Sequence, residues 1–167
     1  MPIMKLHNLI SNITTTLRAA IEICEKASDA QSLPLSIQTL CSQLPWIMGA
    51  FDKAKEGFPW SIEPSPDTLA LKGILKDCAN KSSSLEACLR AIIPRADSST
   101  FERYRRSLGL IPTEDKVVML KDGLFSDLKA LAANSAVEAE TQDNVRSLVG
   151  FVTREPGYNL WGVSDSD

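Results

Sequence analysis

The side chains of this chain that could do chemistry are few. A single histidine, His7, lies near the start, so a Cys-His or Ser-His relay would depend on it alone. The sequence contains no phosphate-binding G-x-x-x-x-G-K-[ST] loop and no G-x-S-x-G, H-E-x-x-H or G-x-G-x-x-G motif. Glu138 and Glu140 are two residues apart, and residues at that spacing diverge on a helix. We therefore predict no catalytic residues, no cofactor and no enzyme activity.

The four cysteines are widely spaced along the chain. Cys24, Cys41, Cys78 and Cys88 each fall where a helical pattern calls for an apolar residue. A zinc site needs about four Cys or His ligands, and only His7 could supplement the cysteines. We therefore predict buried free thiols and no metal site.

A basic cluster surrounds the stretch of the sequence that has the most signals for helix starts and ends. Pro94 stops a helical pattern, Ser99 and Glu102 form a capping box, and Gly109 can close a short helix over 99–108. Two interpretations of the arginines stay open: a solvated face paired with nearby acids, or a surface that docks an acidic partner or lipid headgroups. The cluster consists of Arg90 and of four arginines that form a candidate basic contact surface, Arg95, Arg103, Arg105 and Arg106.

The stretch 3–27 is predicted to be an amphipathic helix, because its apolar residues recur at spacings of three and four. The simpler interpretation is that these apolar residues pack in the core. The functional one is that the helix leaves the bundle and presents its apolar stripe to a membrane or to a second protomer. The candidate membrane or partner face consists of Leu6, Ile10, Ile13 and Leu17. The opposite side, with Asn8, Thr15, Arg18, Glu22 and Lys26, suits a solvated face.

Four further helices are predicted besides this one and the corner helix over 99–108. They cover about 35–56, 66–92, 113–133 and 136–152. Pro45 is expected to kink the first of these near Ser42 or to divide it into two abutting pieces. Ser65 is predicted to cap the second, and Ser135 with Glu138 to form a capping box for the last. The apolar residues of the Pro-rich loop between them, Phe58, Trp60 and Ile62, are expected to fold back onto the core.

Composition fits a single all-α domain. The chain has 167 residues, 44% of them hydrophobic, and no strand pattern competes with the helices. We predict a helical bundle of about six helices over 1–153 and a C-terminal tail or linker over 154–167. The net charge of −3 argues against a nucleic-acid partner. No signal-peptide pattern is present, which predicts a cytoplasmic location.

Several landmarks in this order resemble one known family, the SesA-type N-terminal domains of fungal NOD-like receptors, which precede NACHT or other P-loop NTPase modules. The resemblance covers roughly residues 10–152. Its landmarks are Leu33-Pro34, Leu44-Pro45, the 71–92 helix with Cys78 and Leu85-Glu86, Ile93-Pro94-Arg95-Ala96-Asp97, Glu102-Arg103-Tyr104-Arg105, Val118-Met119-Leu120, Leu128, Leu131 and Ala132.

The resemblance implies a HeLo-like bundle that acts in non-self recognition and regulated cell death. The leading hypothesis is a non-enzymatic signalling or effector domain that works through oligomerisation. Its partners would then be further copies of itself or an NTPase-containing receptor module. The resemblance also implies an alternative, a cell-death executioner whose N-terminal helix targets membrane lipids once activation brings the domain to the membrane. A protein-binding helical adaptor is the third hypothesis, and a small helical enzyme would instead require a concave site with converging polar groups.

Overall fold

The computed structural model describes residues 2–27, 33–59, 65–93 and 114–154, and this part of the chain contains helices and no strand. The predicted all-α class is thereby confirmed. The predicted corner helix over 99–108 lies outside the described residues, and so does the predicted tail beyond residue 154. The helices are α1 Pro2–Glu25, α2 Leu35–Glu56, α3 Pro66–Ile92, α5 Glu114–Ala132 and α6 Ala139–Arg154.

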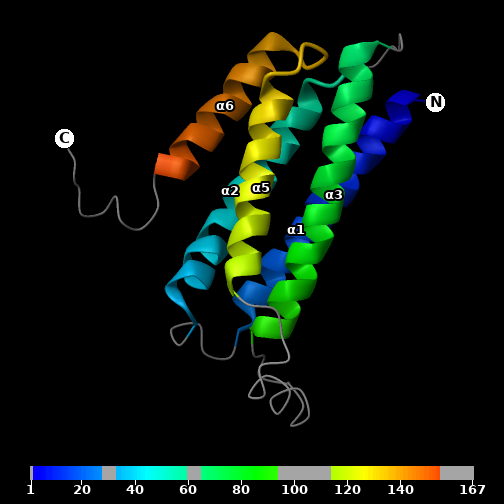
Figure 1. Ribbon diagram of the computed structural model, residues 1–167. Helices are drawn as coiled ribbons and strands as arrows, with labels where there is room; N and C mark the ends of the chain where they lie inside the picture. Colours follow the sequence, from blue (N-terminus) through cyan, green and yellow to red (C-terminus); the bar gives the residue numbers. More distant parts are fainter. Residues whose placement is uncertain (1, 28–32, 60–64, 94–113, 155–167) are drawn as a thin grey trace, which may run out of the picture.

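The helices run up and down in chain order, and four of them form a closed ring (Figure 1). Helix α1 packs against α2 and α3, and α5 packs against the same two helices on the other side. In Figure 1, α3 and α5 lie in front of α1 and α2. Helix α6 packs onto α2 and α5, outside the ring. Helix α1 therefore packs mainly against two described helices, α2 and α3, and its remaining side faces away from the ring.

One continuous hydrophobic core fills the bundle. It draws on every described helix, with Ile13 from α1, Phe51 from α2, Leu85 from α3, Leu128 from α5 and Val145 from α6 all fully buried. Each helix contributes residues at spacings of three and four, which lie on one face of a helix. The periodicity of the sequence therefore predicted the core correctly.

Helix α3 begins as its sequence predicts. The Ser65 hydroxyl accepts from the Thr68 backbone N–H at 3.1 Å, and the Thr68 hydroxyl accepts from the Ser65 backbone N–H at 2.9 Å. Pro66 occupies the first helical position, where a missing N–H costs nothing. The N-cap prediction is confirmed, with Thr68 completing the box.

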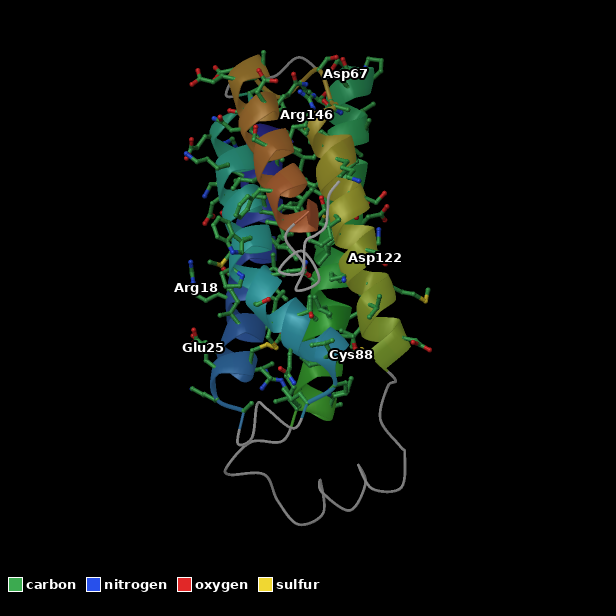
Figure 2. The ribbon with its side chains drawn as sticks, turned by 90° about the vertical axis from the view of Figure 1, so that its left-hand side faces the viewer. Arg18, Glu25, Asp67, Cys88, Asp122 and Arg146 are labelled. Atoms are coloured by element: carbon green, nitrogen blue, oxygen red, sulfur yellow. A yellow bond between two sulfur atoms is a disulfide. The ribbon has the colours of Figure 1, made fainter. Side chains whose placement is uncertain are left out.

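Helix α2 passes through Pro45 as one helix from Leu35 to Glu56, so the alternative of two abutting pieces is wrong. Its first turns, in cyan, lean relative to its later turns in Figure 2, as a proline kink predicts. Pro45 is exposed, so its ring sits on the solvent side of the helix.

The predicted capping box of the last helix is wrong, because α6 begins at Ala139 and Ser135 lies four residues before it. Other groups hold this turn. The Glu138 backbone N–H donates to the Gly57 carbonyl at 2.9 Å, and the Asn134 side chain accepts from the Ala136 N–H at 2.8 Å. The Gly57 carbonyl comes from the end of α2, and local sequence spacing could not reveal such a long-range partner.

Candidate functional site

The predicted membrane or partner face of α1 is the core face of the closed bundle. Leu6 is 4% exposed, and Ile10, Ile13 and Leu17 are 0% exposed. These four side chains can meet a lipid or a second protomer only if α1 separates from α2 and α3. Their role outside the bundle stays a prediction.

The outer face of α1 is polar, as expected. Figure 2 shows Arg18 and Glu25 pointing away from the bundle. The predicted solvated residues Asn8, Thr15, Arg18, Glu22 and Lys26 are all exposed.

Specific contacts anchor the N-terminal half of α1 to the end of α2. The Lys55 ammonium donates to the Ser11 hydroxyl at 3.0 Å. His7 meets Phe58 edge to face, with ring centroids 5.8 Å apart. Phe58 is buried, which confirms its predicted return to the core, whereas Trp60 and Ile62 lie outside the described residues. The half-buried Lys55 and the buried His7 thus fix the register of α1 on α2.

A disulfide between Cys24 and Cys41 anchors the other end of α1, and it corrects the prediction of four free thiols. It joins the last turn of α1 to the second turn of α2, with the two Cα atoms 5.8 Å apart. The sulfur–sulfur bond lies near the labelled Glu25 in Figure 2. Both cysteines follow the apolar periodicity of their helices, which predicts burial but not which helices meet. The pairing becomes visible only when the antiparallel packing of α1 and α2 brings the two turns together.

The disulfide borders a groove of about 370 Å³ at this end of the bundle. Ile21, Leu33 and Pro45 supply apolar walls, so the groove surface next to the sulfurs is mostly hydrocarbon. The Gln38 amide donates to the Leu33 carbonyl at 2.7 Å, and this hydrogen bond fixes the chain before α2 to its first turn at the groove. Cys24 and Cys41 are half-buried residues rather than fully buried ones.

Cys78 and Cys88 are buried free thiols, as predicted. Cys78 on α3 lies 3.5 Å from the Asp127 carboxylate on α5, which also accepts from the Lys81 ammonium at 2.8 Å. Burial first, and then the negative charge of Asp127, raise the pKa of the Cys78 thiol far above its usual range. A thiol in this environment stays protonated, so the arrangement links two helices but does not prepare a nucleophile.

The candidate basic contact surface cannot be placed, since Arg95, Arg103, Arg105 and Arg106 lie outside the described residues. Arg90, at the end of α3, is described and forms an ion pair with Glu86 one turn earlier. For this one member of the cluster, the interpretation as a solvated, paired side chain is confirmed.

An exposed aromatic pair on α2 and α6 was missed by the sequence reasoning. Trp46 is 47% exposed and Phe151 is 42% exposed, with ring centroids 5.1 Å apart. Each lies off the buried stripe of its helix, so the periodicity that marks the core passes over it. The sequence signal that could have found this pair is that each helix carries a large apolar residue outside its buried stripe.

The described residues offer neither a metal-binding cluster nor a membrane-spanning helix. No three His, Cys, Asp or Glu side chains among them gather where a metal ion could bind. No described helix has the length and apolarity that crossing a bilayer requires.

Comparison with protein families gives one result. A family model described as SesA, the N-terminal domain on NACHT NTPases and P-loop NTPases, matches residues 10–131. These residues run from α1 to the end of α5 and so include the closed ring, whereas α6 lies beyond them. No curated protein and no solved structure matches the chain.

Proposed function

The chain belongs to the SesA family of N-terminal domains on NACHT and P-loop NTPases, and from this premise we propose that it is a non-enzymatic signalling domain that responds to clustering. Its partners are neighbouring copies of the domain and the NTPase module of a NOD-like-receptor-type protein. In the same proposal it belongs to the HeLo-like group and serves fungal non-self recognition and regulated cell death.

The observation that carries the proposal is the family match over residues 10–131. A domain tethered to an NTPase shares the oligomeric state of that NTPase. When oligomerisation brings tethered domains together, their local concentration reaches about the millimolar range without any new contact. Contacts too weak to form between free domains then form between neighbours. Clustering is therefore a sufficient switch for a domain that carries no catalytic residues.

The experiment compares the free domain with the domain fused through its C-terminus to a multimerising scaffold. The free domain is expected to sediment as a monomer at micromolar concentration. On a fully occupied scaffold, hydrogen exchange should slow on surfaces that are exposed in the monomer. A scaffold that carries one domain and otherwise blank subunits is the matched control, because it has the same tether and no neighbour. Equal exchange on full and single-copy scaffolds would contradict clustering as the switch.

A second candidate function, a membrane-targeting executioner, is favoured by the position of α1. This helix is a corner of the ring and packs mainly on α2 and α3. Its buried face from Leu6 to Ile23 is mostly apolar and is interrupted only by the buried polar side chains of His7 and Thr14, so a released α1 would present an amphipathic helix to a bilayer. Glu22 and Glu25 on its outer side weaken the attraction of Arg18 to anionic headgroups. Release in many clustered copies would compensate for the weak binding of one helix.

Co-flotation with anionic and neutral liposomes tests this second function. The executioner hypothesis predicts flotation of the fully occupied scaffold, and none of the single-copy scaffold. Limited proteolysis of the floated sample should then leave the α1 peptide with the vesicles. If neither scaffold floats, the adaptor hypothesis gains support, and the exposed pair Trp46 and Phe151 is the surface to mutate first.

A further inference from the structure

The disulfide between Cys24 and Cys41 suggests a control point that is separate from clustering. It is a covalent cross-link between the side chains of α1 and α2, and it acts in addition to the Lys55–Ser11 hydrogen bond. We propose that this pair is a redox site whose oxidised form locks α1 onto the bundle and whose reduced form lets α1 open. The inference goes beyond the proposed function, because it concerns the mobility of α1 whether or not clustering is the trigger.

The position of the bond determines what it locks. It holds the last turn of α1 to α2, and the buried residues Leu17, Ala20 and Ile23 lie on the two turns that precede it. While the bond is intact, these turns cannot move away from the start of α2. The N-terminal half of α1 is held only by noncovalent contacts. Opening of the complete apolar face therefore requires the bond to break.

The four cysteines fall into two classes, and only one class suits redox chemistry. Cys78 and Cys88 are 0% and 3% exposed, so a reductant or oxidant does not reach them in the folded state. Cys24 and Cys41 are half-buried and border the groove of about 370 Å³. A small dithiol, or the active-site dithiol of an oxidoreductase, can approach the sulfurs through this groove.

The reduction is an ordinary thiol–disulfide exchange with a dithiol. One thiolate of the reductant attacks a sulfur of the Cys24–Cys41 bond and forms a mixed disulfide, while the other cysteine leaves as a thiolate and takes a proton. The second thiolate of the reductant then attacks the mixed disulfide and releases the remaining cysteine. Two electrons and two protons pass to the cysteine pair, and the reductant leaves as its own disulfide. Reducing compartments such as the cytosol supply dithiols of this class.

The size of the effect follows from loop closure. The bond joins residues 17 positions apart, and cross-linking a loop of this length shifts the equilibrium toward the more restricted form by a factor on the order of 100. Reduction should therefore raise the population of the open form of α1 by up to that factor. Exchange of the α1 amides reports this population directly.

The test begins with the purified full chain, without reductant, and measures its free thiols by alkylation and mass spectrometry. The protein is unfolded in the alkylating reagent while the disulfide is kept intact. Two free thiols are then expected, and four would overturn the proposal. Hydrogen exchange is then measured with and without dithiothreitol. Exchange is expected to accelerate more in α1 than in α5, whose slowest amides report only the loss of global stability on reduction. Unchanged exchange in α1 after complete reduction would also overturn the proposal.

The matched control is the double variant Cys24→Ser/Cys41→Ser. Its α1 should exchange as fast as in the reduced wild type, with no response to dithiothreitol. A response to dithiothreitol in this variant would assign the effect to Cys78 or Cys88 and overturn the proposal. The wild-type comparison needs no substitution, so it decides the question even if the variant folds poorly. Because these measurements use the free domain, their failure is distinguishable from a failure of the clustering proposal.

Discussion

At the scale of single residues, Asp127 on α5 joins two side chains of α3. It accepts from Lys81 at 2.8 Å and from the Cys78 thiol at 3.5 Å. The Lys81 side chain is 31% exposed and can turn to water when its partner loses charge. We therefore expect Asp127→Asn to lower the free energy of unfolding by only about 1 kcal/mol.

Urea unfolding measures this cost, and Asp143→Asn is the control. Asp143 pairs with Arg146 on α6 with both side chains largely exposed, so its substitution should change the free energy of unfolding by less than about 0.5 kcal/mol. If the two variants lose the same amount, the link between α3 and α5 is no stronger than a surface pair.

Cys78 gives a prediction for alkaline pH. Burial and the Asp127 charge raise its pKa in the folded state above the 9.0 of an unperturbed thiol. The unfolded chain therefore releases a proton above about pH 9 that the folded chain keeps. Folding stability from this group is complete below pH 9 and falls as the pH rises, by about 1.4 kcal/mol per pH unit. Cys78→Ala should remove this part of the slope.

The slope itself is the measurement, taken from urea unfolding between about pH 9 and pH 11. The absolute stability of Cys78→Ala is not informative here, because the smaller side chain also leaves a cavity. Hydrogen bonding to Asp127 raises the pKa of Lys81 as well, so some alkaline loss persists in both proteins. Identical slopes would show that the folded-state thiol titrates normally.

Which residues are buried was predictable from the sequence, but which residues meet was not. The stripe of α1 gave Leu6, Ile10, Ile13 and Leu17 as one face, and all four are buried together. The same periodicity placed Cys24 and Cys41 on packed faces and assigned them as free thiols. Contact between two helices depends on their relative height and rotation, which a single amphipathic pattern does not contain. The disulfide was missed for that reason, and the pair of Trp46 with Phe151 was missed because each residue also lies off the buried stripe of its helix.

At the scale of helices, the junction of α2 with α6 depends on Gly57. A Cβ atom added to Gly57 would lie 2.5 Å from the Thr141 Cβ, which is closer than packed atoms approach. The Gly57 carbonyl also accepts from the Glu138 N–H, so the backbone cannot shift freely. We expect Gly57→Ala to lower the free energy of unfolding by about 1 to 3 kcal/mol, as overpacked substitutions do.

The control for this glycine lies within α2, which ends directly before Gly57. Apart from the adjacent residues and nearby backbone of its own helix, Gly49 has nothing within 4 Å of an added Cβ, so Gly49→Ala should raise the free energy of unfolding by up to about 1 kcal/mol through helix propensity. Thermal or urea unfolding of both variants gives the comparison. A stabilised Gly57→Ala variant would mean that α6 does not pack on Gly57 in solution.

Helix α1 gives a second prediction at this scale. Ile13 is fully buried, and a carboxylate placed there would lose its hydration without gaining a partner. Ile13→Asp should cost more than about 4 kcal/mol and leave little folded protein, whereas Thr15→Asp on the exposed face should change stability by about 0.5 kcal/mol or less. Circular dichroism and urea unfolding measure both.

This pair of variants also decides how the membrane hypothesis is tested. A charge at Ile13 or Leu17 removes the fold along with any membrane activity, so loss of liposome binding in such a variant is not diagnostic. Ile13→Asp with wild-type stability would show instead that α1 is not part of the core in solution.

Helix starts were predictable where the capping groups are local. Ser65 caps α3 from within four residues, and its sequence signal was correct, whereas the part that Thr68 plays in the box was not predicted. The start of α6 depends on the Gly57 carbonyl, about 80 residues earlier in the chain, and its predicted box was wrong. Sequence patterns therefore give helix ends reliably only where no other helix supplies a partner.

At the scale of the whole molecule, the ring of α1, α2, α5 and α3 coincides with the family match, and α6 is added on the α2–α5 side. Helix α1 and helix α6 occupy different sides of the ring. Helix α6 leads to the C-terminal end, where an NTPase module would follow in the proposed arrangement.

The last prediction concerns the effect of the disulfide on the unfolded chain rather than on any contact in the bundle. A bond between residues 17 positions apart restricts the unfolded ensemble and should contribute about 3 kcal/mol to the free energy of unfolding. Reduction should therefore lower the urea midpoint and also steepen the transition, because the unfolded chain becomes more expanded. Cys24→Ser/Cys41→Ser without reductant should reproduce both changes. A lowered midpoint with an unchanged slope would place the effect in the folded bundle, whereas unchanged values for both would mean that the bond does not constrain the chain.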